Sequence, residues 1–445
     1  RMAFEELGPT YVKLGQALST RPDLIPLEFI NEFSKLQDHV PPFPFEQAAE
    51  IIEKDLGAAP TELFAKIDET PIASGSIGQV HKAWLTYGEP VAIKVQRPGI
   101  QRIIEVDLEI MLHLATLIEH HIEELSLHRP VKIVEEFANA LEKEVDYTIE
   151  ATNMERFAGQ FLDTPTVYVP KVHRDKTTSR MLTTEFIDGI KVSDVESLKA
   201  SGLDSKVITA NGADLLFKQI FDHGFFHADP HPGNIFALPN NVICLLDLGN
   251  SGMVDRGTRE NFVELVDSIV QRNERRATQI LIRLTTYDDE PDIRQMEKDV
   301  ADFMGRHLYK PLKDIQLGKL LHEILVIASR HRLRIPPDIF LMMKAFATVE
   351  GVGQMLDPDF DMISRASPVI QRVKLARFYP DRLYGDIFDL ASELLQFIQQ
   401  FPKDMLEITR LARQRKLFLN LEHQGLSKLL ATHDQISNRI AFSII

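Results

Sequence analysis

Three polar side chains in the middle of the chain have the types and spacing of a phosphoryl-transfer site. Asp229 lies in the run His227-Ala-Asp-Pro-His-Pro-Gly-Asn234, so Asn234 follows it by five residues. Asp247 comes thirteen residues later, after an apolar run. In such sites one aspartate orients the nucleophile, while an asparagine and a second aspartate hold Mg²⁺. Because Mg²⁺ prefers oxygen ligands, Asn234 and Asp247 are candidate metal ligands and Asp229 is the candidate catalytic carboxylate.

The same segment permits a second interpretation, a transition-metal site. His227, Asp229 and His231 form a His-x-Asp-x-His pattern, and histidine is the commonest ligand for such metals. This interpretation gives no role to Asn234 or Asp247. We therefore favour phosphoryl transfer and expect both histidines to support the loop.

A lysine in a strand-like run precedes these residues in the sequence. Lys94 follows Val91-Ala-Ile93 and precedes Val95. An ammonium buried in an apolar strand needs an anionic partner, and a triphosphate or a carboxylate would serve. The alternative is a surface lysine whose stem lies along apolar neighbours while its charge reaches water.

A loop of small residues before Lys94 could hold phosphate. Glycine has no Cβ, so backbone N–H groups beside it can approach phosphate oxygens. The loop keeps two of the three glycines of Gly-x-Gly-x-x-Gly-x-Val; taken alone, it is more typical of an ordinary turn. The candidate phosphate-binding residues are Ala73, Ser74, Gly75, Ser76, Ile77, Gly78 and Val80.

The elements that must position these residues change along the chain. Residues 1–62 read as helices separated by prolines, and 63–96 as short strands with a hairpin. Residues 100–153 show helical spacing of apolar positions, and 165–190 return to strands. The rest is mainly helical apart from strands within 224–252. The pattern predicts an α+β chain that is predominantly helical.

Composition excludes several classes of protein. The 445 residues are 44% hydrophobic and 26% charged, which is typical of a globular protein and not of a disordered, collagen-like or coiled-coil chain. The net charge of −15 argues against a nucleic-acid partner, because such proteins carry a basic footprint. The single cysteine, Cys244, excludes an internal disulfide framework, and its apolar surroundings predict an inert side chain.

Taken in order, these segments resemble the protein-kinase-like superfamily. The shared order is a small-residue loop, Val-Ala-Ile-Lys94, the run from Asp229 to Asn234, and Asp247-Leu-Gly249. The loop departs from the superfamily by beginning with Ala73, and an alanine replaces the arginine of His-Arg-Asp. No Ala-Pro-Glu segment follows. Without that docking segment we do not expect phosphorylation of a protein in trans.

Two further motifs narrow the resemblance to one family. Lys13-Leu-Gly-Gln16 and the run from Glu144 to Asn153 resemble the Lys-x-Gly-Gln and Glu-x-Asp…Glu-Ala-x-Asn signatures of the UbiB/ABC1/ADCK family of atypical kinases. The resemblance covers about residues 7–252. It implies a two-lobed protein-kinase-like fold with an N-terminal helical extension and C-terminal helices.

The expected domains follow from this resemblance and from the pattern of elements. Residues 1–62 would be the helical extension, 63–190 the N-lobe with a helical insert, and 191–365 the C-lobe. Residues 366–445 would be a C-terminal helical region. The apolar run Ile440–Ile445 suggests either a cut just before a membrane segment or a helix end that packs on the core.

The family resemblance also implies roles for individual residues. Glu150 would pair with Lys94 and thereby position the phosphates of ATP. The backbone of the hinge between the lobes, at Glu185, Phe186 and Ile187, would hold the adenine edge. A lid over the active site would be formed by Lys13, Gln16, Glu144 and Asp146, with Lys13 paired to Glu144. On spacing alone, Asp146 and Glu150 would share one face of a helix.

The implied cofactors are ATP and Mg²⁺, and the implied activity is ATP binding with ATP hydrolysis. The resemblance places this activity in isoprenoid quinone biosynthesis, in particular that of ubiquinone, with quinone precursors, other membrane lipids or biosynthetic enzymes as partners. Two alternatives stay open: a kinase for a lipid or small molecule, and a pseudokinase scaffold. We expect the cytoplasmic face of a bacterial inner membrane or an equivalent organelle membrane. The basic and apolar run Arg410–Leu419 could lie on anionic headgroups or pack on its own core.

Overall fold

The computed structural model describes residues 1–376 except 20, 22, 23, 26, 34, 37–39, 123–128 and 308–315, together with 400–402, 405, 406, 410 and 413. Contacts divide the chain into a unit of residues Arg1–Lys374 and a unit of residues Leu375–Ile445. The architecture below is that of the first unit. The expected membrane-facing run 410–419 and the apolar end 440–445 lie almost wholly outside the described residues.

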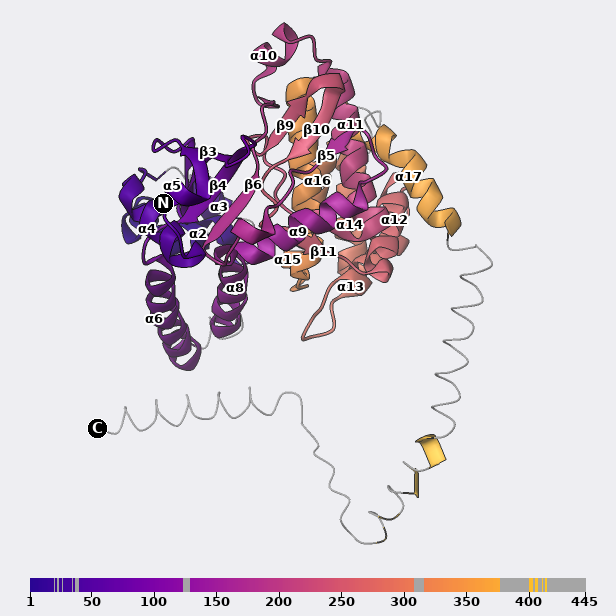
Figure 1. The fold of residues 1–445 in the computed structure, drawn as a ribbon. Coiled ribbons are helices and arrows are strands. Elements are labelled where there is room, and N and C mark those ends of the chain that lie inside the picture. Colours follow the sequence, from indigo (N-terminus) through magenta and orange to yellow (C-terminus); the bar gives the residue numbers. More distant parts are fainter. Residues whose placement is uncertain are drawn as a thin grey trace, which may run out of the picture. The chain divides into compact units, whose positions relative to one another are not determined.

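An antiparallel sheet forms the amino-terminal lobe, drawn in indigo and purple in Figure 1. Its strand order is β1 (Phe64–Ile67), β3 (Gly78–Leu85), β4 (Pro90–Gln96) and β6 (Met181–Glu185), and β2 (Ala73–Ser74) pairs with β3. Buried and less buried residues alternate along β3 and β4, as a strand with one face on the core requires. The predicted hairpin is confirmed.

Proline marks several helix starts in the amino-terminal extension, because its fixed φ suits the first helical turn. The helices are α1 (Met2–Leu7), α2 (Pro9–Leu18), α3 (Leu27–Phe33), α4 (Phe45–Leu56) and α5 (Pro60–Leu63). Ala48 and Ile52 of α4 are buried against Ile93, Val95 and Met181 of the sheet. Helix α4 thereby covers one face of the sheet that carries Lys94.

Three helices separate β4 from the rest of the lobe: α6 (Ile100–His121), α8 (Pro130–Val145) and α9 (Tyr147–Gln160). Figure 1 shows α6 and α8 side by side as a projection from the lobe, whereas α9 runs across to the second lobe. The expectation that Asp146 and Glu150 share a helical face is wrong. Asp146 has φ −87° and ψ 100°, and its carboxylate caps α9 by accepting from the Thr148 N–H.

The carboxy-terminal lobe contains two small sheets. One has the order β5 (Val167–Tyr168), β10 (Val242–Leu245), β9 (Ile235–Leu238) and β7 (Ile190–Lys191). The other pairs β8 (Phe225–His227) with β11 (Ser251–Met253). The strands predicted within 224–252 are therefore present. Asp229 follows β8, Asn234 directly precedes β9, and Asp247 follows β10.

Helices make up the rest of this lobe. They are α10 (Val195–Ala200), α11 (Ser205–Phe217), α12 (Arg256–Val270), α13 (Glu274–Leu284), α14 (Ile293–His307), α15 (Leu317–Arg330), α16 (Pro337–Leu356) and α17 (Met362–Ala376), with short helical turns at Arg174–Lys176, Lys218–His223 and Pro239–Asn241. The lobe is built around α16, whose Phe346 stacks on Phe262 of α12 with ring centroids 5.6 Å apart. The fold is α+β, predominantly helical and two-lobed, as predicted.

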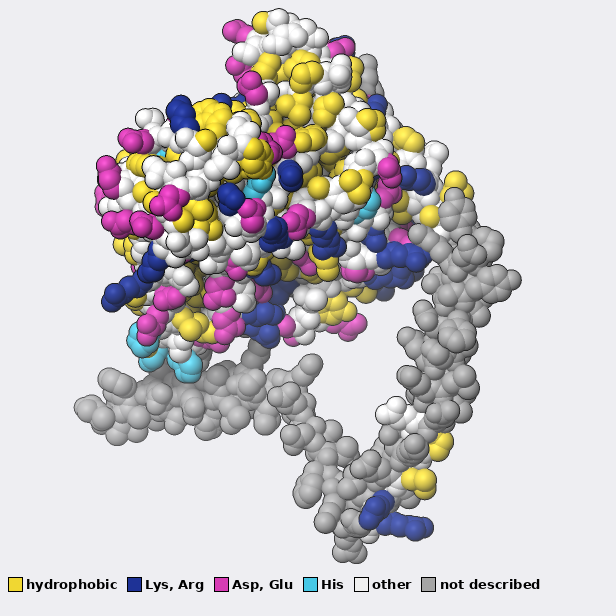
Figure 2. Space-filling model, in the orientation of Figure 1, with side chains coloured by type: hydrophobic (Ala, Val, Ile, Leu, Met, Phe, Trp, Pro, Cys, Tyr) yellow, Lys and Arg dark blue, Asp and Glu magenta, His cyan; other side chains and the backbone are white. Residues whose placement is uncertain are grey.

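Helix α16 is the one described helix whose length and composition would suit a membrane span. In this fold it is a core helix, since Ile339, Met342, Met343 and Phe346 are all buried. Charged side chains of both signs are interspersed over the face in Figure 2, with acidic groups along the outer edge of the amino-terminal lobe.

Candidate active site

An ion pair between the partly buried Lys94 and the buried Glu150 lies at the centre of the site. Lys94 is opposite Val80 on β3 and Leu182 on β6. Its Nζ is 2.8 Å from Oε2 of Glu150 on α9 and 3.8 Å from Oδ2 of Asp247. The side chain of Glu150 is only 5% exposed. The lysine thus has the anionic partners that its burial demands, and the surface-lysine alternative does not apply.

The three charges perturb one another. Burial raises the pKa of Glu150 to about 7, against the opposing effect of Lys94. Burial would lower the pKa of Lys94, but Asp247 and Glu150 together raise it well above its usual value. Lys94 is the main cause of a lowered pKa at Asp247. Lys94 and Asp247 are therefore charged at neutral pH, whereas burial shifts the pKa of Glu150 upward.

The β9–β10 hairpin brings Asn234 and Asp247 together. Ile235 pairs with Leu245, and the Leu246 N–H donates to the Asn234 carbonyl over 3.0 Å. The Asp247 carboxylate accepts from the Gly249 N–H at 3.1 Å. Asn153 of α9 donates to the Leu248 carbonyl at 3.0 Å, which fixes the turn after Asp247. Hard oxygen atoms from an amide and a charged carboxylate are a donor set that fits Mg²⁺.

The loop that carries Asp229 is held by its histidines. The imidazole of His227 is buried, which lowers its pKa and keeps it neutral, and its Nδ1 lies 3.2 Å from the Asn250 carbonyl. The His231 Nδ1 accepts from the Gly233 N–H at 3.2 Å. Within the described ranges no three His, Cys, Asp or Glu side chains come together as metal ligands. The transition-metal interpretation is therefore not supported.

Asp229 has a partner that the sequence patterns did not reveal. Lys344 of α16, 115 residues further along the chain, places its Nζ 3.1 Å from Oδ2 of Asp229. A signal was present: Lys344 is the one basic residue in a predominantly apolar helix, and a charged side chain among apolar neighbours was also the reason to single out Lys94.

The small-residue loop is a tight turn between β2 and β3. The Gly75 N–H donates to the Gly78 carbonyl at 2.8 Å, and Ser76 and Ile77 are buried. A Cβ at Gly78 would lie 2.5 Å from both the Tyr147 hydroxyl and the Val95 carbonyl. Gly78 is therefore required for this close packing. The register of Gly78 against Gln96 and of Val80 against Lys94 places the loop over the lysine.

Two further residues around the loop were missed by the sequence analysis. Arg97 donates from Nε to the Gly75 carbonyl at 2.9 Å and from Nη2 to the Ser74 hydroxyl at 3.0 Å. The ring of Tyr147 lies 5.0 Å from the Nζ of Lys94, and its buried hydroxyl has no hydrogen-bond partner among the described residues. Neither residue belongs to a local pattern, because each contact joins residues that are far apart in the sequence.

The segment Val40–Phe43 is attached to the loop from the other side. Arg97 Nη2 donates to the Pro41 carbonyl at 2.8 Å. The buried amide of Gln79 accepts from the Phe43 N–H at 3.0 Å and donates to the Phe43 carbonyl at 3.2 Å. These bonds join the amino-terminal extension to the candidate phosphate loop.

The hinge between the lobes is already partly hydrogen-bonded. The Glu185 N–H donates to the Lys171 carbonyl at 2.9 Å, and the Phe186 N–H donates to the Pro90 carbonyl at 3.1 Å. The ammonium group of Lys82 makes a cation–π contact with Phe186, with Nζ 3.9 Å from the centroid of the ring. The N–H groups of Glu185 and Phe186 are therefore already used. If the backbone of this segment binds adenine, the carbonyl groups of these residues or the backbone groups of Ile187 must make the hydrogen bonds.

The amino-terminal extension reaches the site through α2. Lys13 forms an ion pair with Glu144 of α8, the contact expected from the family resemblance. Lys13 also adds to the effect of Lys94 in lowering the pKa of Asp247. Gln16 donates to the Leu36 carbonyl at 3.3 Å, so it holds the extension together. The carboxylate of Asp146 binds Thr148 and caps α9.

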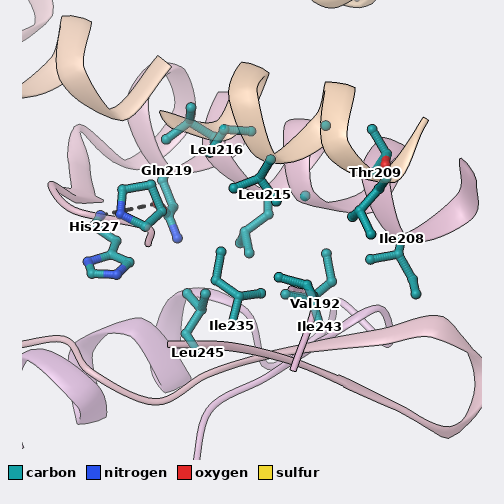
Figure 3. Close-up of a pocket in the computed structure, with 16 residues that line it drawn as sticks. Val192, Ile208, Thr209, Leu215, Leu216, Gln219, His227, Ile235, Ile243 and Leu245 are labelled. Atoms are coloured by element: carbon teal, nitrogen blue, oxygen red, sulfur yellow. Dashed lines mark hydrogen bonds between the residues drawn. The ribbon is translucent and has the colours of Figure 1, made fainter. Parts of the chain in front are cut away.

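A cavity of about 40 Å³ lies below the Asp229 loop, between α11, α16 and the β9–β10 hairpin (Figure 3). Its walls are mainly apolar, with His227 and Gln219 at one end. The buried Nε2 of His227 and hydroxyl of Thr209 have no partner within the described part of the chain. The cavity includes neither Lys94 nor Asp247, so it is separate from the charged site.

Comparison with known proteins identifies the family of this chain. A model of the ABC1 atypical kinase-like domain matches residues 35–281, which is more than half of the chain. The chain belongs to this family. A UbiB helical domain matches residues 300–361 of the same ABC1-family chain, the region that contributes Lys344.

Similar proteins come from bacteria and plants. A "Probable protein kinase UbiB" of Marinobacter nauticus is 36% identical over 407 residues, covering 91% of this chain and 74% of that protein. "Protein ACTIVITY OF BC1 COMPLEX KINASE 7, chloroplastic" of Arabidopsis thaliana is 36% identical over 369 residues, and the chain spans only 53% of its length. The solved structure of Rv3197 with erythromycin from Mycobacterium tuberculosis has a TM-score of 0.57, 25% identity, and covers 79% of this chain and 90% of that one.

Proposed function

We propose that this protein binds Mg-ATP and transfers the γ-phosphoryl group to water, as an ATPase of the ABC1 family. The observation that carries the proposal is the Lys94–Glu150 pair, with Asp247 3.8 Å from Lys94 and with Asn234 and Asp229 on the adjoining loop. These are the parts that phosphoryl transfer requires, in the order in which kinases use them.

Each residue would have a defined task. Lys94, oriented by Glu150, binds phosphate oxygens, and Asn234 and Asp247 would hold Mg²⁺, which supplies positive charge against the phosphates when bound. Asp229 orients a water oxygen and accepts its proton while the bond from phosphorus to ADP breaks. The loop from Ala73 to Gly78 would cover the phosphates.

The Lys13–Glu144 ion pair supports the proposal that α2 acts as a lid. It ties the amino-terminal extension to α8 beside the charged site, and it would hinder the approach of a protein substrate. Water or a small acceptor fits this arrangement better. A lipid kinase is the second candidate, and a scaffold that binds nucleotide without turnover is the third.

The metabolic setting is proposed from the relatives alone. Several are named UbiB, which supports a role in isoprenoid quinone biosynthesis, with quinone precursors or other membrane lipids as partners. We place the protein at a membrane, on the cytoplasmic face in bacteria or its organelle equivalent; the chloroplastic relative supports the organelle case.

Thermal unfolding with and without Mg-ATP tests the nucleotide site. Nucleotide at about 100 times its dissociation constant should stabilise the folded state by about 2.7 kcal/mol. Asp247→Asn should lose the Mg²⁺-dependent part of the shift, while Asp175→Asn, at an exposed carboxylate on another turn, should keep it. Absence of any shift with wild-type protein at millimolar Mg-ATP would refute the proposal.

Phosphate release separates the three candidate activities. An ATPase releases inorganic phosphate from wild-type protein without an acceptor, and Asp229→Asn abolishes that release. A lipid kinase would instead transfer label from ATP to a polyprenyl phenol in detergent. A scaffold would show the thermal shift with neither product.

A further inference from the structure

The Asp229 loop contains no cation of its own. Between Asp229 and Asn234 the chain reads Pro-His-Pro-Gly, and the Nδ1 of His231 is occupied as an acceptor for the Gly233 N–H. The positive charge beside Asp229 comes from Lys344 instead, with Nζ 3.1 Å from Oδ2. The two side chains are 27% and 43% exposed, so both are accessible to solvent.

The position of Lys344 is fixed by the core and not by a loop. The next residues of α16, Ala345 and Phe346, are buried. One turn further on, the buried Glu350 accepts from the Leu317 N–H at 2.8 Å and the Gly318 N–H at 2.7 Å, which locks α16 to the start of α15. A charged group held on a rigid helix is well suited to bind a ligand at a defined point.

Several negative charges would meet around Asp229 and Asp247 when nucleotide binds. Lys94 already lies beside the carboxylates of Glu150 and Asp247, and Mg-ATP still carries net negative charge, so a further cation beside the γ-phosphate would be favourable. An ammonium group has three N–H donors, of which Asp229 needs one. The other two can bind phosphate oxygens. A fixed positive charge at that point stabilises the negative charge that develops on these oxygens during transfer.

We propose that Lys344 is a further catalytic residue, which binds the γ-phosphoryl group of Mg-ATP and delivers it to the nucleophile held by Asp229. The inference rests on the proposed function and deepens it. It assigns to the UbiB helical region, residues 300–361, a direct contact with the substrate. ADP lacks the γ-phosphoryl group, so Lys344 discriminates between ATP and ADP.

A purely structural ion pair makes a different prediction. Partly exposed pairs contribute only about 0–1 kcal/mol to folding, and their loss would affect ATP and ADP equally. The ratio of the two nucleotide affinities therefore distinguishes the roles, whether or not turnover is measurable.

The test uses the full chain with Lys344→Met, Lys344→Arg and the control Lys298→Met, at an exposed lysine of α14. Dissociation constants for Mg-ATP and Mg-ADP are measured by calorimetry, and phosphate release by a coupled assay. Lys344→Met should weaken Mg-ATP binding about tenfold, change Mg-ADP binding less than twofold, and lower kcat about 100-fold, the effect of removing one such donor. Lys344→Arg should restore ATP binding, and Lys298→Met should match wild type.

Two results would overturn the assignment of Lys344. One is an equal loss of ATP and ADP affinity in Lys344→Met, and the other is no loss of either. Wild-type protein that binds neither nucleotide would instead overturn the proposed function itself. A melting temperature of Lys344→Met without nucleotide that matches those of wild type and Lys344→Arg would show that the folded state is retained.

Discussion

Two glycines that line the same cavity should respond in opposite ways to the same added methyl group. Gly212 lies inside α11 and Gly353 inside α16. A Cβ at Gly212 would meet Ile243 Cδ1 at 3.5 Å, an ordinary contact, whereas at Gly353 it would lie 2.5 Å from Phe360 Cδ1 and 3.1 Å from Thr209 Cγ2. The first methyl group enters free space and the second enters an occupied one.

The magnitudes follow from these distances. Gly212→Ala gains about 1 kcal/mol of helix propensity, and burial of one methyl group in the cavity adds up to about 0.8 kcal/mol. We expect an increase of 1–2 kcal/mol in the free energy of unfolding, about the gain from such substitutions elsewhere. For Gly353→Ala, overpacking costs about 1–3 kcal/mol, which cancels or exceeds the same propensity gain.

Differential scanning fluorimetry of both variants without nucleotide provides the assay. Gly212→Ala should melt a few degrees above wild type and Gly353→Ala at or below it. Equal shifts, or a destabilised Gly212→Ala, would show that the cavity below the Asp229 loop is filled or that α11 and α16 pack differently. Unchanged Mg-ATP binding in Gly212→Ala would show that the cavity is separate from the nucleotide site.

Three other predictions concern the charged residues. The pKa of Glu150 is raised from 4.5 to about 7, so the folded state keeps a proton that the unfolded chain releases. Wild type should therefore lose stability relative to Glu150→Gln as the pH rises from about 5 to 8, measured by denaturant titration. Parallel pH profiles of the two proteins would contradict this. Asp146→Ala removes the cap of α9 and should cost about 1 kcal/mol of unfolding free energy, while Asp146→Asn should cost much less; equal losses would point to the charge and not the cap. Chelation of Mg²⁺ by EDTA should abolish the ATP-dependent thermal shift and leave the melting temperature without nucleotide unchanged, and a shift that survives EDTA would remove Asn234 and Asp247 as metal ligands.

Patterns over a few neighbouring residues predicted the elements that depend on those residues alone, such as a hairpin or the start of a helix. Short strand-like runs on either side of Gly88 and Pro90 predicted the β3–β4 hairpin, and proline positions predicted helix starts in the extension. Lys94 could be singled out because a charged group in an apolar strand demands a partner. Its pairing with Glu150 and that of Lys13 with Glu144 came from family resemblance, since 56 and 131 residues separate the partners.

The residues that were missed act across elements that no local pattern connects. Arg97 and Tyr147 follow no spacing rule, and their contacts exist only once β4, α9 and the loop are assembled. Lys344 lies in α16, which belongs to the region that matches the UbiB helical domain and not to the region that matches the ABC1 kinase-like domain. The break at Asp146 was missed because helical spacing continues through it, whereas its side chain competes for the backbone of α9.

The bonds of Arg97 and Gln79 set a physical limit on where the unit that carries the candidate phosphate loop begins. A chain started at Phe45 would keep every strand of the sheet, yet it would lose the Pro41 carbonyl that Arg97 binds and both backbone groups of Phe43 that Gln79 binds. The Gln79 amide, which is fully buried, would then depend on water or His81 alone, and unpaired buried groups cost about 1–3 kcal/mol each. Trimming the chain there would remove the bonds that link the amino-terminal extension to the candidate phosphate loop, and would loosen that loop without changing any of its own residues.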